Sequence, residues 1–458
     1  MFQTIKNAWK VNDLKNRMLF VLFAIVIYRL GASIPVPYVS SDALNTFMNN
    51  AGGSVFGYLN VLSGQAFGSA TLFALSVSPY ITASIVVQLL TIALPPLERW
   101  AKEEGDEGKK KIDLLTRIIT IVLAVITAVG YTILITSKSY AGMTTVDRIT
   151  DGLTLYAFFQ CTVMVLCYCA GAAIIMWIAH QIDEKGIGNG ISMILFANIV
   201  AGFSSLASSL WNIITNEKFH IWGGILIALA CVVVALAVLV FIVWFTDSER
   251  RIPIQYAKQV KGRKMYGGQK TNLPIKLNMS GVMPIIFASS IVSLPATIAG
   301  FFPKVKWLTW IADNFNYYKW PYLVVFLVLL VLFAFFYIQI SFNPVEVANN
   351  IRAQGGSIPG YSAGKATSDQ IKKILHRITL IGAIFLCVIA GVPMLVTVIY
   401  EAVTGGALSA GTADASLVNI AQIAFGGSSL LIVVGVAIET VRELEAQLSL
   451  RNYKGFLD

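Results

Sequence analysis

The feature that most constrains this chain is a succession of long segments that contain no Asp, Glu, Lys or Arg. A hydrophobic stretch of about 18 or more residues with few charges is typical of a helix that crosses a lipid bilayer. Many such stretches follow one another along the chain, separated by short charged segments. The sequence therefore predicts an all-α, polytopic membrane protein.

The composition excludes the other broad classes of protein. Hydrophobic residues make up 56% of the 458 residues and charged residues only 13%, against roughly 45–50% and 25% in soluble domains. A soluble domain of this size would need far more polar surface to cover its core. The same figures exclude a disordered chain, a collagen and a disulfide-rich secreted scaffold.

Ten membrane spans are predicted from the uncharged segments. The spans are Met18–Ile34, Ser76–Pro95, Ile118–Ser137, Gly152–Ala179, Gly186–Asn216, Phe219–Thr246, Leu277–Pro303, Trp320–Val345, Ile378–Tyr400 and Ala415–Ile438. The second of these is the only span taken from an uncharged run of 55 residues, Ala43 to Leu97. It ends at Pro95 and Pro96, because proline does not continue a helix.

The orientation follows from the distribution of basic residues. If the N-terminus is cytoplasmic, 27 Lys and Arg residues lie on the cytoplasmic side and 6 on the other. Cytoplasmic segments of membrane proteins carry an excess of Lys and Arg, so both termini are predicted to be cytoplasmic. The remaining basic residue, Arg29, lies inside the first span, and we interpret it as snorkelling to the outer interface.

Ten spans divide into two halves of five, and an odd number of spans inverts the second half relative to the first. The predicted halves are residues 18–215 and 216–441, flanked by a cytoplasmic N-terminal segment, 1–17, and a cytoplasmic tail, 442–458. Inverted repeats of this kind place a pathway at the interface between the halves. The hinge is expected at the short loop around Glu217.

Part of the long uncharged run, Gly57–Thr71, is too polar to face lipid. It mixes Gly, Ser, Asn and Gln with apolar residues. Irregular backbone at membrane depth persists only where it is buried in protein or lines a cavity. Two interpretations remain open: a loop outside the membrane, or a re-entrant segment inside the protein.

Two cytoplasmic loops, 247–278 and 342–377, are much longer than a connection between spans requires, since most links in compact folds have about 4–6 residues. The first loop alternates apolar and basic residues around a glycine turn, which predicts a projecting two-stranded ribbon. Positive charge together with length favours a large acidic partner, such as ribosomal RNA or a motor protein.

The sequence lacks the common catalytic motifs: the zinc-protease helix motif, the phosphate-binding loop and the serine-hydrolase elbow. Five cysteines lie in apolar stretches without metal-ligand spacing, and three histidines lie far apart at span ends. We therefore expect no enzyme, no metal and no cofactor. An inverted-repeat secondary transporter of a small solute is the alternative, although mid-span charges, which are usual in ion-coupled carriers, are lacking here.

Several segments resemble one known family, SecY, the channel-forming subunit of the bacterial protein translocase. The matching segments are Tyr28–Pro37 (YRLGASIPVP), Pro79–Leu90 (PYITASIVVQLL), Gly186–Ser192 (GIGNGIS), Arg250–Lys258 (RRIPIQYAK), Leu273–Asn278 (LPIKLN), Phe342–Pro344 (FNP) and Phe425–Ile432 (FGGSSLLI). They occur in order over ten predicted spans. The resemblance implies a non-enzymatic channel that conducts unfolded preproteins across the membrane and releases membrane segments sideways into lipid.

The resemblance also implies two five-helix halves around a central hourglass pore. Its constriction would be a ring of apolar side chains at Val77, Ile81, Leu195, Ile286 and Ile432. A plug would fall within residues 57–70, including Gly57, Leu59, Leu62, Gly64 and Phe67. A lateral gate would lie between spans two and three and spans seven and eight, with Thr82, Gln88 and Asn278 near its seam.

The partners that the resemblance implies are the small membrane subunits SecE and SecG, and SecA or the translating ribosome at the cytoplasmic face. The basic residues expected to dock the cytoplasmic partners are Arg250, Arg251, Lys258, Lys261, Arg263, Lys264, Arg352 and Lys365. One position departs from the family pattern: Ser362 stands where an arginine is frequent. Lys365 is expected to supply part of the charge missing there. The implied location is the bacterial cytoplasmic membrane.

Overall fold

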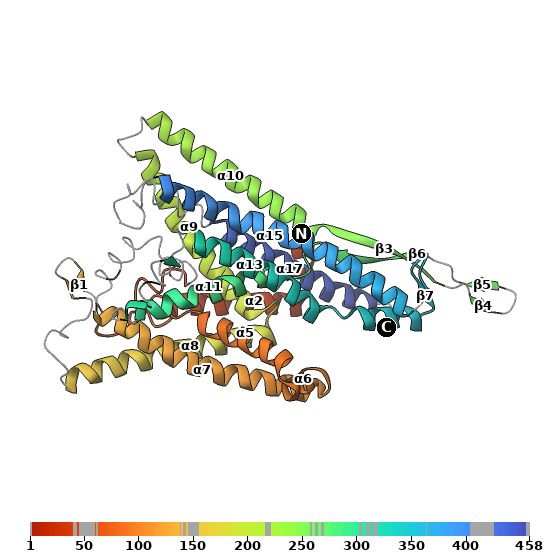
Figure 1. Ribbon diagram of the computed structural model, residues 1–458, viewed down its shortest axis with the longest axis horizontal. Helices are drawn as coiled ribbons and strands as arrows, with labels where there is room; N and C mark the ends of the chain where they lie inside the picture. Colours follow the sequence, from red (N-terminus) through yellow and green to blue (C-terminus); the bar gives the residue numbers. More distant parts are fainter. Residues whose placement is uncertain are drawn as a thin grey trace.

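The computed structural model describes residues 2–39, 63–137, 155–215, 221–256, 270–301, 319–362, 364–403 and 426–454, with short stretches between them. Long helices run roughly side by side, and a small sheet projects beyond one end of them (Figure 1). The helices that overlap the predicted spans are α2 (Asn12–Gly31), α5 (Ser78–Ala93), α7 (Gly105–Ser137), α8 (Leu155–Lys185), α9 (Gly190–Thr215), α10 (Ile221–Asp247), α11 (Met283–Phe301), α13 (Trp320–Ser341), α15 (Lys365–Val403) and α17 (Gly426–Lys454).

Each predicted span thus overlaps a helix, but their lengths differ from the predictions. Among the described residues, five helices are long and apolar enough to cross a membrane, or six if a bent pair counts as one span. The bent pair is α5 and the short helix α6 (Pro95–Lys102), which meet at 106°. The chain is therefore a multi-pass membrane protein, and the number of ten spans stays a prediction.

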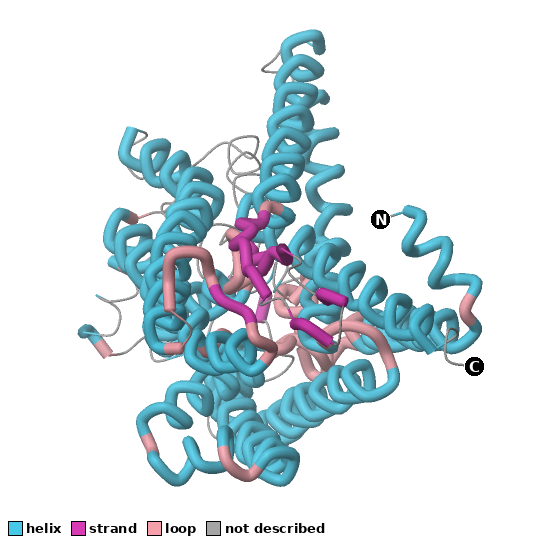
Figure 2. Tube along the Cα trace, turned by 90° about the vertical axis from the view of Figure 1, so that its right-hand side faces the viewer, coloured by secondary structure: helices cyan, strands magenta, loops and turns pink. Residues whose placement is uncertain are grey.

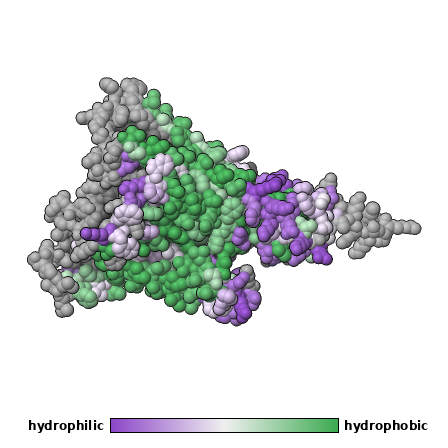
Figure 3. All heavy atoms as spheres, viewed as in Figure 1, coloured by the Kyte–Doolittle hydropathy of each residue, from purple (hydrophilic) through white to green (hydrophobic). Residues whose placement is uncertain are grey.

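The helical region exposes apolar side chains over a broad surface. Figure 3 shows this hydrophobic surface along the helices, with hydrophilic residues gathered at the end that bears the sheet and over α6. On α10 only 12% of the most apolar window is buried, and Leu226 and Trp244 are more than 60% exposed. Apolar surface of this extent on long apolar helices is typical of a protein embedded in a membrane.

The loop at residues 247–278 forms the predicted ribbon. Strand β3 (Glu249–Tyr256) pairs antiparallel with β6 (Lys270–Lys276), in a register that runs from Glu249 opposite Lys276 to Gln255 opposite Lys270. At its tip, β4 (Gln259–Lys261) pairs with β5 (Lys264–Tyr266), and β7 (Gly356–Ser357) adds to the other edge of β3. Figure 2 views the molecule from the end that bears these strands, with the helices behind them.

Buried and exposed side chains alternate along β3, and the buried ones attach the ribbon to the helices. Ile252 and Ile254 on β3 are buried while their neighbours are exposed, as expected for a strand with one apolar face. They pack with residues of α13, α15 and the short helix α14 (Pro344–Ala353). Asn343 caps α14, because its side chain accepts a hydrogen bond from the backbone N–H of Val345 at 3.2 Å. Much of the predicted loop 342–377 is therefore helical.

Contacts between the two predicted halves are made by a few helices. Helix α11 packs against both α5 and α7, and α9 packs against both α10 and α17. Within the first half, α8 packs against α2, α7 and α9. The irregular segment 63–77, which precedes α5, lies among these helices and is described below.

Gly171 on α8 permits the closest approach to this segment. A Cβ atom at position 171 would lie 2.0 Å from the carbonyl oxygen of Leu72 and 2.9 Å from its carbonyl carbon. Backbone atoms cannot move aside as the end of a flexible side chain can. A side chain at this position would therefore push α8 away from the segment.

We expect Gly171→Ala to destabilise the fold by about 1–3 kcal/mol, the usual cost of overpacking a well-packed interior. The measurement is the thermal unfolding midpoint of the purified protein in detergent. Gly202→Ala on α9 is the matched control, because a Cβ there would meet no atom within 4 Å. Equal midpoints for the two variants would contradict the prediction.

Candidate functional site

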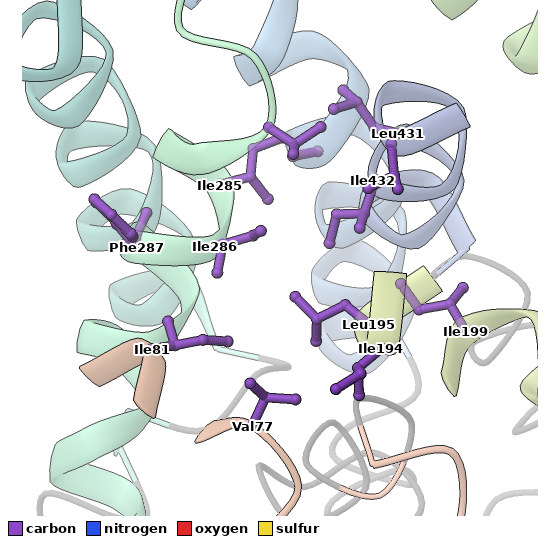
Figure 4. Packing of buried hydrophobic residues seen from close by; sticks show 14 of the residues in the cluster. Val77, Ile81, Ile194, Leu195, Ile199, Ile285, Ile286, Phe287, Leu431 and Ile432 are labelled. Atoms are coloured by element: carbon purple, nitrogen blue, oxygen red, sulfur yellow. The ribbon is translucent and has the colours of Figure 1, made fainter. Parts of the chain in front are cut away.

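The five residues predicted to form an apolar ring lie in one buried cluster. Their exposed fractions are at most 7%: Val77, Ile81, Leu195, Ile286 and Ile432. They come from four helices, since Val77 and Ile81 belong to the start of α5 and the others to α9, α11 and α17. Figure 4 shows the five side chains directed toward one central region, whereas Phe287 and Ile199 point away from it. The structure therefore brings these predicted residues together.

The start of α5 places Val77 and Ile81 on one side of that region. Residues four apart lie on the same face of a helix. Pro79 stands in the first turn of α5, where its missing N–H is not needed and its fixed φ suits a helix. The helix accordingly begins immediately after the segment 63–77.

The segment 63–77 is irregular backbone enclosed by protein. Ala66, Phe67, Ala70 and Phe73 are each at most 5% exposed, and Ser63 is 1% exposed. The two predicted plug residues that are described, Gly64 and Phe67, belong to it, whereas Gly57, Leu59 and Leu62 lie outside the described residues. Of the two interpretations left open by the sequence, burial inside the protein is confirmed for residues 63–77, with the exception of Gln65, which is exposed.

Backbone hydrogen bonds attach this segment to the chain that follows α2. The N–H of Leu72 donates to the carbonyl of Ile34 at 2.9 Å, and the N–H of Val36 donates to the carbonyl of Ala70 at 3.0 Å. Irregular backbone inside a membrane protein needs such partners because water is absent. The motif Ile34–Pro37 therefore acts as a short pairing partner for the segment.

Aromatic side chains hold the segment from two further sides. The hydroxyl of Tyr131 on α7 donates a hydrogen bond to the carbonyl of Phe67, and the two rings are 4.4 Å apart. Tyr168 on α8 packs edge-on against Tyr131 at 5.1 Å. On the other side, Tyr28 of α2 stacks on Phe73 at 5.4 Å. The sequence interpretation missed these tyrosines, because the partner of Tyr131 is a backbone carbonyl.

Three residues of the segment adopt left-handed backbone conformations without being glycine. The φ angles are 73° for Gln65, 46° for Ala70 and 50° for Ser76. Such conformations are uncommon for non-glycine residues and cost of order 1–3 kcal/mol each. They persist only where the surrounding contacts enforce them.

Arg29 is placed differently from the prediction. Its guanidinium does not snorkel: it donates to the carbonyl of Ala197 at 2.9 Å, and to those of Asn198 and Gly64 at 3.4 Å. The side chain therefore connects α2 with α9 and with the segment 63–77. A charge inside a membrane span is the signal that could have indicated this role.

The residues predicted near a lateral gate lie on packed helices, but they do not bond to one another. Thr82 donates to the carbonyl of Ser78 at 3.0 Å, within its own helix. Gln88 also bonds within α5, and Asn278, which is 6% exposed, accepts from Ser280 at 3.3 Å. In the part of the chain that the structure describes, no hydrogen bond joins Asn278 to Thr82 or Gln88.

The residues predicted to dock partners lie, where the structure describes them, on the sheet and on the neighbouring helices. Arg250 and Arg251 are exposed on β3, as are Arg352 on α14 and Lys365 at the start of α15. Lys261 and Lys264 are opposite each other in the β4–β5 pair, while Lys258 and Arg263 lie outside the described residues. These basic positions therefore occur at one end of the molecule.

The base of the ribbon carries a further group of charges. Arg442 on α17 pairs with Asp247 at 2.8 Å, at the end of α10. Burial, and then the positive charge of Arg442, lower the pKa of Lys276 on β6 below its ordinary value. The ion pair thereby attaches the end of α10, from which the ribbon starts, to α17, the helix that carries Ile432.

The fold and the site together define a class: a polytopic helical membrane protein in which apolar side chains from four helices converge and an enclosed irregular segment lies beside them. A sequence model of the SecY family matches residues 71–441. The SecY translocase subunits of Streptomyces coelicolor and Bacillus subtilis are 39% and 38% identical, and each alignment covers the whole of both chains. The chain belongs to the SecY family.

Solved structures of similar fold support this assignment. A structure described as a protein-conducting channel has a TM-score of 0.61 at 15% identity, covering 94% of this chain and 92% of that one. Sec61 in a canine ribosome–channel complex has a TM-score of 0.58 at 15% identity, with the same coverage. The protein is therefore a protein-conducting translocation channel subunit, and the comparisons give no support to a small-solute transporter.

We expect Tyr131→Phe to weaken the attachment of segment 63–77 by about 0.5–1.5 kcal/mol, the usual net contribution of one hydrogen bond. The measurement is the thermal unfolding midpoint in detergent. Tyr168→Phe is the matched control, because the Tyr168 hydroxyl has no hydrogen-bond partner among the described residues. A Tyr168→Phe variant that loses as much stability as Tyr131→Phe would refute this assignment.

Proposed function

We propose that this channel conducts unfolded preproteins across the bacterial cytoplasmic membrane and releases membrane segments sideways into lipid. Residues 18–215 and 216–441 are its two inverted halves, with a pore between them and both termini in the cytoplasm. The observation that carries this proposal is the convergence of five apolar side chains from four helices, two of them in each half (Figure 4). The excess of basic residues on one side supports the orientation.

The five residues form the seal of the resting channel. A narrow apolar constriction expels water and so excludes hydrated ions, without needing a charged barrier. Residues 57–70 are the plug. A solved SecY protein of similar fold, with a TM-score of 0.57 at 15% identity, is described as having a plug domain that stabilises the closed state and maintains a membrane seal. The burial of residues 63–70 beside Val77 supports the same role here.

The lateral exit lies where α5 and α7 meet α11, with α13 as its fourth helix. The packing of α11 against α5 and α7 supports this position. Thr82 and Gln88 bond within α5, and Asn278 bonds to Ser280. Because no hydrogen bond among these described residues crosses the seam, the halves can separate there without leaving a cross-seam polar pair unsatisfied.

The channel itself performs no chemistry, and its energy comes from cytoplasmic partners. SecA or the ribosome docks on the basic ribbon and on the neighbouring residues Arg352 and Lys365, and SecE and SecG are the small membrane subunits. Two similar solved structures are ribosome-bound channels, a canine Sec61 and a yeast Ssh1 complex, the latter with a TM-score of 0.52. The exposed Arg250 and Arg251 supply positive charge for an acidic partner such as ribosomal RNA.

Replacing Ile81 and Ile286 by Ser, together with deletion of residues 57–70, should make the resting channel conduct ions. Hydroxyl groups at the constriction retain water, and the second barrier is removed. The measurement is single-channel current in planar bilayers without substrate, where we expect resolvable current steps that the unaltered protein lacks.

The matched control for this seal is Leu226→Ser with Val328→Ser, at two positions that face outward and are at least 60% exposed. The control should stay closed. A folded variant with the altered constriction and without the plug that still passes no current would place the seal elsewhere.

Reversing the charge at the ribbon tip, with Lys261, Arg263 and Lys264 changed to Glu, should weaken ribosome binding. With fewer phosphate contacts, binding releases fewer counterions from the RNA. The affinity should therefore also depend less steeply on salt concentration. The measurement is ribosome affinity over a range of salt concentrations. Lys304→Glu with Lys306→Glu, on the predicted outer side, should leave both quantities unchanged. Unaltered binding after the triple reversal would disprove docking at this tip.

A further inference from the structure

Arg29 occupies a socket made of carbonyl oxygens. It lies in α2 two residues before the helix ends at Gly31. Its guanidinium donates to Ala197 and Asn198, which are successive residues of α9, and to Gly64 of the segment 63–77. Among the described residues no carboxylate forms an ion pair with it. The cation is therefore stabilised by the backbone of two elements that are distant in sequence.

Position 64, the third carbonyl of this socket, requires glycine. A Cβ at position 64 would lie 2.8 and 2.9 Å from the two terminal nitrogens of Arg29 and 3.1 Å from the Cα of Asn198. Its φ is also +62°, in the left-handed region that favours glycine. Position 64 thus lets the backbone turn and lets the guanidinium approach it closely.

The socket is connected to the constriction on both sides. Ala197 and Asn198 follow Leu195 on α9, so the ring residue and the socket share one helix turn. The amide of Asn198 donates to the hydroxyl of Ser76 at 3.2 Å, and Ser76 precedes the ring residue Val77. Arg29 therefore fixes the segment 63–77 to the same part of α9 that supports the constriction.

We propose that Arg29 is a positioning residue that latches the segment 63–77 against α9 in the closed channel. This inference rests on the proposed role of residues 57–70 as the plug, of which the segment contains residues 63–70. Movement of the segment out of its site breaks the bond between Arg29 and Gly64, while the bonds to α9 keep the guanidinium in place to receive it again. The left-handed residues Gln65, Ala70 and Ser76 favour departure, because their backbone relaxes once the segment is released.

The test measures release of the segment directly. Ser69, which is half-buried on the segment, is changed to Cys in a full-length protein whose native cysteines are replaced by Ser, and the protein is reconstituted in vesicles. The readout is the labelling rate of Cys at position 69 by a membrane-impermeant maleimide. Arg29→Met removes the bond to Gly64 together with the two bonds to α9, and it should raise this rate about tenfold or more.

Two further variants separate the latch from a general loss of structure. Arg17→Met, at an arginine of the same helix whose partner is Asp13 at 3.8 Å, should leave the labelling rate unchanged. Arg29→Lys keeps the charge but lacks the planar fork that reaches three carbonyls, so its rate should fall between those of the unaltered protein and Arg29→Met. If Arg29→Met does not fold, the labelling rate of Arg29→Lys relative to the unaltered protein is the test of the latch.

An unaltered labelling rate in both Arg29 variants would overturn the latch, and so would equal increases in the Arg17 and Arg29 variants. The leak measurement on the Ile81 and Ile286 variant without the plug is made in parallel. If that variant conducts ions while the Arg29 variants keep the segment in place, the seal stands and the latch is wrong. If it stays closed while Arg29→Met releases the segment, Arg29 does hold the segment against α9, but the proposed seal is wrong and this contact does not keep the channel closed.

Discussion

The structure depends on one constraint: inside a bilayer, every backbone N–H and carbonyl must find a partner within the protein. The long helices meet it by themselves. The segment 63–77 meets it partly through its own turns, in which the N–H of Thr71 donates to the carbonyl of Ala66, and partly through bonds to Ile34, Val36 and Tyr131. The same constraint applies to the side chain of Arg29, a cation inside a predicted span. Its N–H groups are satisfied by the carbonyls of Gly64 and of α9. Polar groups thus concentrate where regular structure fails.

Much of this arrangement could be predicted from the sequence, because its causes are periodic or compositional. Uncharged runs locate ten helices, and alternation of apolar and basic residues locates the β3–β6 ribbon. The polarity of Gly57–Thr71 indicates a segment that cannot face lipid. Most of residues 63–71 are buried in the structure, which agrees with the interpretation of a segment inside the protein. The ring residues followed from a family resemblance, and the structure gathers them in one cluster.

The remainder could not be predicted, since it rests on contacts to backbone atoms. A carbonyl acceptor has no residue type, so neither the bond from Tyr131 to Phe67 nor the socket of Arg29 leaves a pattern in the sequence. The extension of α7 back to Gly105 and of α15 back to Lys365 was also missed, because charged residues outside the membrane continue a helix as well as apolar ones do. The 106° bend between α5 and α6 has a local cause at Pro95, but its angle is set by packing.

The ribbon has a kinematic consequence. Strand β3 begins two residues after α10 ends, and β6 ends seven residues before α11 begins. The N–H of Leu277 also donates to the carbonyl of Ser248 at 3.0 Å, which closes the ladder at its base. The ends of α10 and α11 that adjoin the ribbon are therefore joined through one hydrogen-bonded sheet, and a large displacement of one end from the other would break hydrogen bonds between β3 and β6. Helices α10 and α11 therefore move chiefly together with the β3–β6 sheet, and not independently of it.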